Sequence, residues 1–101
     1  MKLYAIRRRG NWKDKSELSI TAGVSARVGN EEMPDKVRWI RSYVVREPNG
    51  RLGTVCIYQG INDAAIQEHA RRAGMSADEI TLIEDTVIVR DDPVQADAKA
   101  A

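Results

Sequence analysis

The histidine and the cysteine of this sequence, His69 and Cys56, each occur once and carry much of its potential chemistry. Imidazole is a common ligand of divalent transition metals, which makes His69 a candidate metal ligand. The structural alternative is a histidine at a helix edge that is hydrogen-bonded to a backbone or carboxylate oxygen. A nucleophilic thiol needs a neighbouring base or positive charge that favours the thiolate, and Arg41 is the candidate for Cys56. The alternative there is a small buried thiol.

A second group of residues has the composition of a small-molecule pocket. Aromatic rings supply apolar walls, and the guanidinium of Arg41 supplies an anion-binding group. The candidate binding residues are Trp39, Arg41, Tyr43, Cys56 and Tyr58. A dimer interface packed from the same side chains without a cavity is the open alternative. No residue is assigned a catalytic role.

A predicted β-hairpin over residues 37–59 positions this group and turns at Asn49-Gly50. An Asn-Gly pair accepts the positive φ angles of a two-residue type I′ turn, and both flanks are rich in strand-forming residues. Such a turn places Pro48 opposite Arg51. Counting outward then gives the pairs Val44–Val55, Tyr43–Cys56, Ser42–Ile57 and Arg41–Tyr58.

This register predicts two different faces for the hairpin, because side chains alternate along a strand. The face expected to form the core carries Ile40, Ser42, Val44, Val55 and Ile57. The face expected to be left uncovered carries Trp39, Arg41, Tyr43, Thr54, Cys56 and Tyr58. We expect the aromatic and cationic face to meet a ligand or a partner.

Two helices are predicted from capping residues and periodicity. The first begins near Asp14 or Ser16, either of which can cap it, and runs to about residue 32. Its apolar stripe is formed by residues four apart, Ile20, Val24 and Val28. The second spans residues 63–73, ends at Gly74, and carries His69 on or beside its buried stripe.

Strands over residues 2–8 and 81–90 complete the pattern, the first with Tyr4 and Ile6 toward the core. The order strand, helix, strand, strand, helix, strand corresponds to two right-handed crossovers joined by a hairpin. We therefore predict an α+β, ferredoxin-like βαββαβ domain over residues 1–92, with a four-stranded antiparallel sheet and two helices on one face. Residues 93–101 are predicted to form a flexible tail. Burial of the uncovered aromatic face against a second copy predicts a homodimer.

Charge and composition exclude several other classes. Sixteen Lys and Arg against fifteen Asp and Glu give a net charge of +1, which provides no electrostatic reason to expect nucleic acid or a membrane as partner. The run Arg7-Arg8-Arg9 is interpreted as a solvated strand end. One cysteine forms no internal disulfide, and no apolar run approaches the roughly 20 residues of a spanning helix. Without the features of a secretory signal at the start, we expect a cytoplasmic protein.

Three segments of the sequence resemble a bacterial family of about this length, long catalogued as a domain of unknown function, that includes a nickel-responsive, nickel-binding protein. They are Trp39-Ile40-Arg41-Ser42-Tyr43-Val44, then Cys56-Ile57-Tyr58, then Glu68-His69-Ala70 followed by Gly74-Met75. The resemblance runs from about residue 2 to residue 93. It implies a ferredoxin-like dimer of the dimeric α+β barrel type, whose sheets enclose a small-molecule cavity, and nickel binding in some members.

Three functions remain open on this basis. The first is a homodimeric binding protein for nickel or another divalent transition metal, with His69 as ligand. The second is a cofactor-free isomerase or monooxygenase-like enzyme, acting on a small organic molecule in a cavity on the sheet face, supported by Arg41 beside Tyr43, Tyr58 and Cys56. The third is a purely structural or regulatory dimer.

Overall fold

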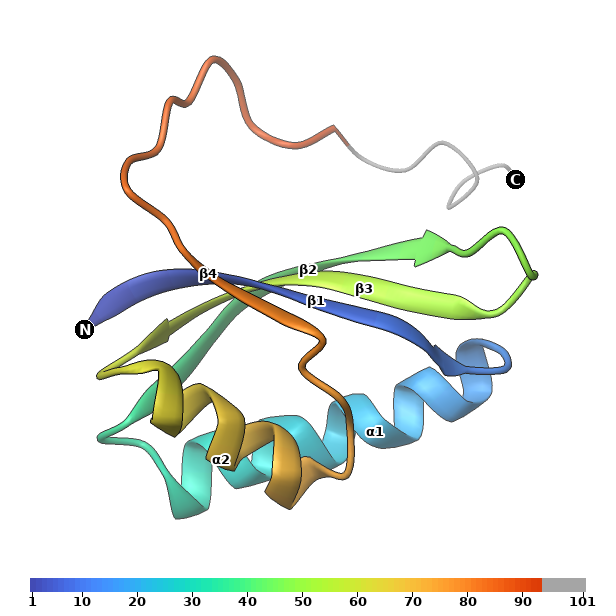
Figure 1. Ribbon diagram of the computed structural model, residues 1–101, viewed down its shortest axis with the longest axis horizontal. Coiled ribbons are helices and arrows are strands. Elements are labelled where there is room, and N and C mark those ends of the chain that lie inside the picture. Colours follow the sequence, from blue (N-terminus) through green and yellow to red (C-terminus); the bar gives the residue numbers. More distant parts are fainter. Residues whose placement is uncertain (94–101) are drawn as a thin grey trace.

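The computed structural model describes residues 1–93 of the 101-residue chain. Over these residues the strands form one antiparallel sheet in the order β2-β3-β1-β4, and both helices cover the same face of it (Figure 1). The elements are β1 (Lys2–Trp12), α1 (Lys15–Arg27), β2 (Val37–Arg46), β3 (Leu52–Gly60), α2 (Asp63–Ala73) and β4 (Glu79–Leu82). The predicted ferredoxin-like arrangement is confirmed. Of the predicted tail, residues 94–101 lie outside the described residues.

The turn of the β2–β3 hairpin differs from the prediction. The amide of Gly50 donates to the carbonyl of Glu47, and the amide of Glu47 donates to the carbonyl of Arg51. These bonds define a three-residue loop in which Pro48 takes the first central position of a type I turn, a position that suits its fixed φ. Gly50 follows at φ +89°, the left-handed residue that completes such loops. The predicted two-residue turn is therefore wrong.

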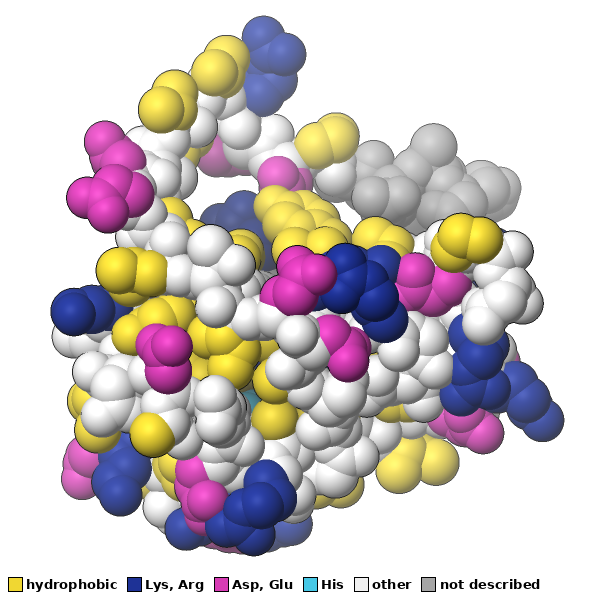
Figure 2. Space-filling model, in the orientation of Figure 1, with side chains coloured by type: hydrophobic (Ala, Val, Ile, Leu, Met, Phe, Trp, Pro, Cys, Tyr) yellow, Lys and Arg dark blue, Asp and Glu magenta, His cyan; other side chains and the backbone are white. Residues whose placement is uncertain are grey.

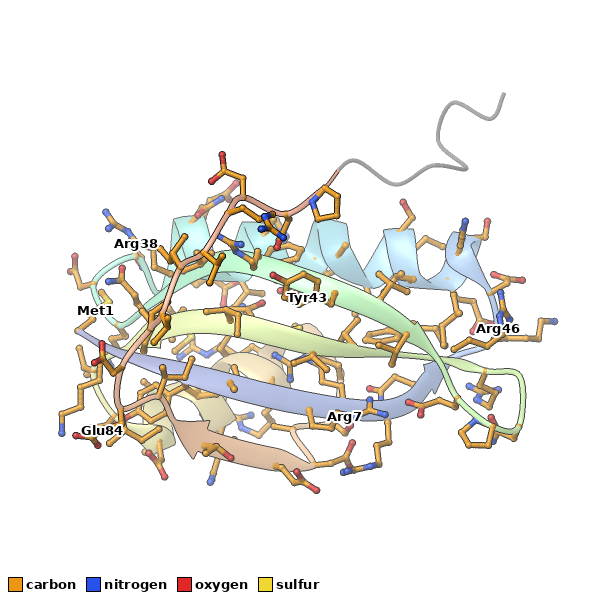
Figure 3. The ribbon with its side chains drawn as sticks, turned by 90° about the horizontal axis from the view of Figure 1, so that it is seen from above. Met1, Arg7, Arg38, Tyr43, Arg46 and Glu84 are labelled. Atoms are coloured by element: carbon orange, nitrogen blue, oxygen red, sulfur yellow. The ribbon has the colours of Figure 1, made fainter. Side chains whose placement is uncertain are left out.

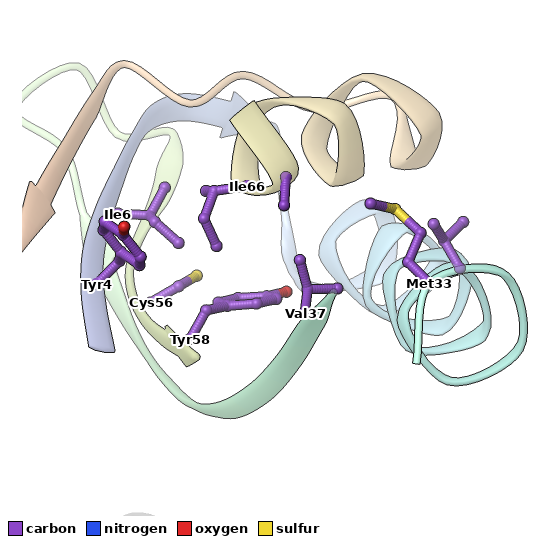
Figure 4. Close-up of a cluster of buried hydrophobic side chains, with 9 residues drawn as sticks. Tyr4, Ile6, Met33, Val37, Cys56, Tyr58 and Ile66 are labelled. Atoms are coloured by element: carbon purple, nitrogen blue, oxygen red, sulfur yellow. The ribbon is translucent and has the colours of Figure 1, made fainter. Parts of the chain in front are cut away.

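The longer loop shifts the register by one residue and exchanges the faces of β3. The pairs are Val44–Thr54, Tyr43–Val55, Ser42–Cys56 and Arg41–Ile57. Cys56 and Tyr58 therefore lie under the helices, where Figure 4 shows them on the same side as Ile66 of α2, whereas Val55 and Ile57 face the open side. The prediction that Thr54, Cys56 and Tyr58 occupy the uncovered face is wrong.

A bulge at Ile40 interrupts the ladder, because Trp39 pairs with Tyr58 and Arg41 pairs with Ile57. The extra residue carries Trp39 to the helix-covered face, where its ring stacks on that of Tyr58. Arg41 and Tyr43 remain on the open face, as predicted. The predicted uncovered set is thus divided between both faces of the sheet.

Helix α1 begins at the predicted cap, because the side chain of Asp14 accepts a hydrogen bond from the amide of Glu17. A π-helical turn, Val28–Glu32, continues it to the predicted end just before Pro34. The predicted apolar stripe is only partly correct: Val28 is buried, but Ile20 points to solvent. The side chain of α1 that is fully covered is instead a serine, Ser25.

Helix α2 matches the sequence prediction closely. Asn62 caps its start, and Gly74 ends it at φ +73° in the left-handed conformation. His69 lies on the buried stripe beside Ile66, and both side chains are almost completely covered. The core between α2 and the sheet is formed by Tyr4, Ile6, Val28, Met33, Val37, Cys56, Tyr58, Ala65 and Ile66.

The last strand is shorter than predicted. Its pairing with β1 ends at Leu82. The residues beyond it, up to Arg90, which were predicted to continue the strand, lie outside the sheet. The segment 83–93 arches over the open face (Figure 1), and Figure 2 shows apolar side chains standing on this arch away from the body. Val87, Ile88 and Val89 are each more than three-quarters exposed. No helix among the described residues is long and apolar enough to cross a membrane.

Candidate functional site

A cavity of about 360 Å³ lies between the inner face of α1 and the sheet. The side chains that α1 turns toward it are mostly small, which prevents the helix from filling the space above the strands. On the helix side the cavity is lined by Leu18, Thr21, Ala22 and Ser25, and on the sheet side by Arg8, Trp12, Trp39, Ile40, Arg41, Ser42, Val44, Thr54, Cys56 and Tyr58, with Met75 beside them. We call this space the α1 cavity.

Stacked aromatic rings form one wall of the α1 cavity. The rings of Trp39 and Tyr58 are nearly parallel, 6° apart in plane and 6.0 Å apart between centroids. Trp39 is 38% exposed whereas Tyr58 is 1% exposed, so the pair runs from the mouth of the cavity to its buried end. Such rings offer flat apolar surface to a ligand.

Polar groups along the strands are paired with one another. The indole N–H of Trp39 donates to the hydroxyl of Ser42 over 2.8 Å, and that hydroxyl donates to the Cys56 thiol over 2.9 Å. The thiol donates in turn to the hydroxyl of Thr54. This chain of bonds holds Cys56 as a satisfied buried thiol, which agrees with the structural alternative for that residue.

A second set of bonds joins α1 to α2 behind the aromatic wall. The hydroxyls of Ser25 and Tyr58 are 2.9 Å apart, and the Nε2–H of His69 donates to the carbonyl of Ser25 over 3.0 Å. Burial lowers the pKa of His69, and the nearby cation of Arg8 lowers it further. Burial also raises the pKa of Tyr58. Both rings are therefore neutral near pH 7.

Arg8 is the side chain of the cavity whose donors are not all used. It is completely buried, and its Nη1 donates to the carbonyl of Ser76 over 2.6 Å. Its Nε and Nη2 have no hydrogen-bond partner among residues 1–93, and no carboxylate of that range pairs with it. The guanidinium carbon lies 5.7 Å from the centroid of the Tyr58 ring. The interpretation of Arg7-Arg8-Arg9 as a solvated strand end is therefore wrong for Arg8.

The structure turns three of the five predicted binding residues toward this cavity, Trp39, Cys56 and Tyr58, whereas Arg41 borders the cavity with its guanidinium on the open face. Tyr43 lies on the open face, where Figure 3 shows it from above. Its hydroxyl donates to the carboxylate of Asp92 over 2.7 Å, and the same carboxylate pairs with Arg41. Arg41 thus has an anionic partner, whereas Arg8 has none among residues 1–93.

Arg8, Ser25 and Trp12 were missed by sequence reasoning. The signal for Arg8 was its place in β1, because it is two residues beyond Ile6 and four beyond Tyr4, on the same face. The signal for the cavity itself was the run of small residues on α1 opposite the aromatic strands. Trp12 lies four residues beyond Arg8, on the same face by alternation, but the predicted strand ended at residue 8, before the irregular stretch that precedes Trp12.

The residues around His69 do not make a complete metal site in one chain. Within the part of the chain that the structure describes, no group of three or more His, Cys, Asp or Glu side chains lies together. His69 offers one nitrogen, Nδ1, which is buried without a partner there. A transition metal needs further donors, and the cation of Arg8 close by disfavours another positive charge.

Comparison with known proteins agrees with this fold. The crystal structure of SCO4226 from Streptomyces coelicolor A3(2) matches with a TM-score of 0.64 over 84% of this chain and 99% of that chain, at 19% sequence identity. None of the curated proteins matches the chain. At this identity, the structural likeness shows a shared fold.

The family is shown by the sequence itself. The family model described as "Nickel responsive protein SCO4226-like" matches residues 4–83, which include β1 and all elements through β4 apart from a few end residues. The matched region contains every residue that lines the α1 cavity and the whole of α2 with His69. The chain therefore belongs to the SCO4226-like family of nickel responsive proteins.

Proposed function

We propose that this chain is a small-ligand binding protein, which acts as a homodimer and holds its ligand in the α1 cavity. The observation that carries the proposal is the hollow between the small inner side chains of α1 and the stacked rings of Trp39 and Tyr58. Its volume lies within the roughly 300–1,000 Å³ range of ligand pockets, and its lining mixes apolar rings with a few polar groups, as ligand sites do.

Binding can be read from the protein's own fluorescence, because both tryptophans of the sequence, Trp12 and Trp39, line the cavity. We would titrate the full chain with 3-phenylpropanoate and with its neutral amide. The proposal expects saturable changes with at least one of them, and loss of binding in Ala22→Phe, which fills the cavity. Ala64→Phe on the exposed side of α2 is the matched control and should bind normally. No binding of either probe, or full binding by Ala22→Phe, would overturn it.

The homodimer is supported by the open face and the arch over it. Three consecutive β-branched side chains, Val87, Ile88 and Val89, are exposed there, and contiguous apolar surface of this kind favours association. A second copy would cover them. Light scattering should show a dimer for the wild type and a monomer for Ile88→Asp. Ile20→Asp, at an equally exposed but isolated site on α1, should stay dimeric, and a wild-type monomer would refute the proposal.

Nickel binding is the second candidate, which the description of the family favours and to which the unpaired Nδ1 of His69 offers one donor. The remaining donors would have to come from outside the described chain. Calorimetric titration of the wild type and of His69→Ala with nickel tests it. Binding that is lost in the variant supports a site at His69, whereas equal binding in both proteins removes His69 from the site.

A further inference from the structure

We infer that the ligand of the α1 cavity is a small organic carboxylate, and that Arg8 is the residue that binds its charged end. The inference rests on the proposed function, which places a ligand in this cavity, and it adds the chemical class of that ligand. It follows from which donors of the cavity are already used and which are not.

Among the buried polar side chains that line the cavity, one has donors without a hydrogen-bond partner in the described residues. Ser42, Cys56 and Thr54 bond to one another, and the hydroxyls of Ser25 and Tyr58 bond to each other. Among the buried side-chain nitrogens and oxygens of residues 1–93, those without a partner are Arg8 Nε, Arg8 Nη2 and His69 Nδ1. Of these residues Arg8 lines the cavity. Among the buried polar groups that line the cavity, the one without a full set of partners in the described residues is therefore a cation.

The free atoms of Arg8 match a carboxylate in shape. Nε and Nη2 lie on one edge of the guanidinium and present parallel N–H groups, the fork that binds both oxygens of a carboxylate. The remaining nitrogen, Nη1, is held by the Ser76 carbonyl, which fixes the plane of the group, while Nε and Nη2 have no hydrogen-bond partner among the described residues. A buried charge without a partner is unfavourable, and an anionic ligand would remove the penalty.

The rest of the ligand is defined by the other walls. Beyond Arg8 the cavity is bounded by rings and aliphatic side chains, including those of Trp12, Trp39 and Val44. These groups favour an apolar body, and the moderate volume favours one ring or a short branched chain. Arg41 is the other cation that lines the cavity, but its guanidinium is paired with Asp92. The charged end of the ligand is thus directed to Arg8.

The experiment compares 3-phenylpropanoate, 3-phenylpropanamide and inorganic phosphate on the full chain by tryptophan fluorescence and calorimetry. We expect the carboxylate to bind the wild type at least about tenfold more tightly than the amide, because a charge-assisted pair replaces a neutral one. In Arg8→Met the two should bind equally. Arg8→Lys, which keeps the charge but not the fork, should retain only part of the preference. Arg9→Met, the same change at an exposed neighbour, should behave as the wild type.

Each other result has a distinct meaning. Equal binding of carboxylate and amide by the wild type overturns the carboxylate inference and leaves ligand binding in the cavity standing. Tighter binding of phosphate than of the carboxylate also overturns it. A preference for carboxylate that persists in Arg8→Met removes Arg8 from the site. Binding of the amide by Arg8→Met shows that this variant is folded with its cavity intact, so loss of the preference is not a folding defect.

Discussion

Arg7 and Arg8 are neighbours on β1, yet they lie in opposite environments. Arg7 points to the open face, where its Nη2 donates to Glu47 over 2.8 Å and its Nη1 bonds to the carbonyl of Arg8. Glu47 also accepts a hydrogen bond from the amide of Gly10, so both of its carboxylate oxygens are paired. Arg8 points under the helices, and two of its donors have no partner among the described residues. Two adjacent arginines thus differ: Arg7 belongs to a network of paired groups, whereas two donors of Arg8 have no partner among the described residues.

This difference distinguishes a structural arginine from one available to a ligand. The Arg7–Glu47 pair ties β1 to the hairpin loop and is complete without any further molecule. The guanidinium of Arg8 is buried against the Tyr58 ring and the Ser76 carbonyl and has no carboxylate partner among the described residues, so an anion that enters the cavity would supply one. The comparison therefore predicts that perturbing the two sides of β1 will have different consequences for stability and for binding.

The largest loss of stability is expected from Gly53→Ala, which disturbs the packing around the Arg7–Glu47 ion pair. A Cβ at Gly53 would come within 2.5 Å of the carbonyl oxygen of Arg8, and it would also overlap the carboxylate of Glu47. Backbone cannot move away as a flexible side chain can, so we expect a loss of about 3 kcal/mol in the free energy of unfolding, measured by urea denaturation.

The matched control is Gly23→Ala on α1, where an added Cβ meets nothing within 4 Å. Alanine favours the helix over glycine, so this variant should gain about 0.5–1 kcal/mol. A lower free energy of unfolding for Gly53→Ala together with a higher one for Gly23→Ala would support the packing described around Glu47. A neutral Gly53→Ala would contradict it.

A smaller loss is expected from Glu47→Gln, and it should depend on pH. The hydrogen bond from Arg7 lowers the pKa of Glu47, so the folded chain keeps this carboxylate ionised at a pH where the unfolded chain takes up the proton. The stabilisation is complete above the ordinary pKa of 4.5 and is lost as the pH falls through the lower folded value. The variant should be less stable than the wild type at pH 7, and the difference in urea midpoint should shrink below pH 4.5. A constant difference would argue against the ion pair.

The smallest expected effect on stability concerns His69, which is buried on the helix-covered side of the sheet near Arg8. Burial lowers its pKa from 6.5, so the unfolded chain binds a proton that the folded chain does not, and stability falls as the pH drops below 6.5. His69→Gln removes this titration. Thermal unfolding between pH 7.5 and 5.5 should show a steeper decline for the wild type than for the variant. Parallel curves would mean that the imidazole is protonated in the fold.

The helices and the order of elements were predictable because local signals decided them. Asp14, Asn62 and Gly74 act through their own side chain or backbone within one turn of the helix, and the structure shows each of them in that role. His69 on the buried stripe followed from the same periodicity. The α+β fold followed from the order alone, given the short connections and right-handed crossovers.

The faces of the hairpin were not predictable in the same way, because one residue in the loop reverses a whole strand. Asn49-Gly50 matched a two-residue turn, whereas Pro48 favoured the type I loop that the structure shows, and the weaker signal was the correct one. The bulge at Ile40 then returned Trp39 to the side of Tyr58. Most of the predicted binding residues meet at one cavity, but on the covered face.

The site could be predicted only in part for a physical reason. An aromatic wall can be inferred from composition, but an unpaired cation depends on which carboxylates reach it in three dimensions. Arg41 was the expected anion-binding group and lies beside Asp92, whereas Arg8 was expected in solvent and is buried. Sequence periodicity showed which face Arg8 occupies, but not that two of its donors lack a partner in the part of the chain that the structure describes.

The most direct test of the account is thermal unfolding of wild type, Arg7→Met and Arg8→Met, each with and without 3-phenylpropanoate at ten times the dissociation constant of the wild type. Ligand binding at this concentration should stabilise the wild type by about 1.4 kcal/mol, or roughly 6–11 °C. Arg7→Met should melt lower but keep this increase. Arg8→Met should melt no lower than the wild type without ligand and show no increase with it. A lower melting temperature of Arg8→Met combined with the full increase would show that Arg8 supports the fold and not the ligand.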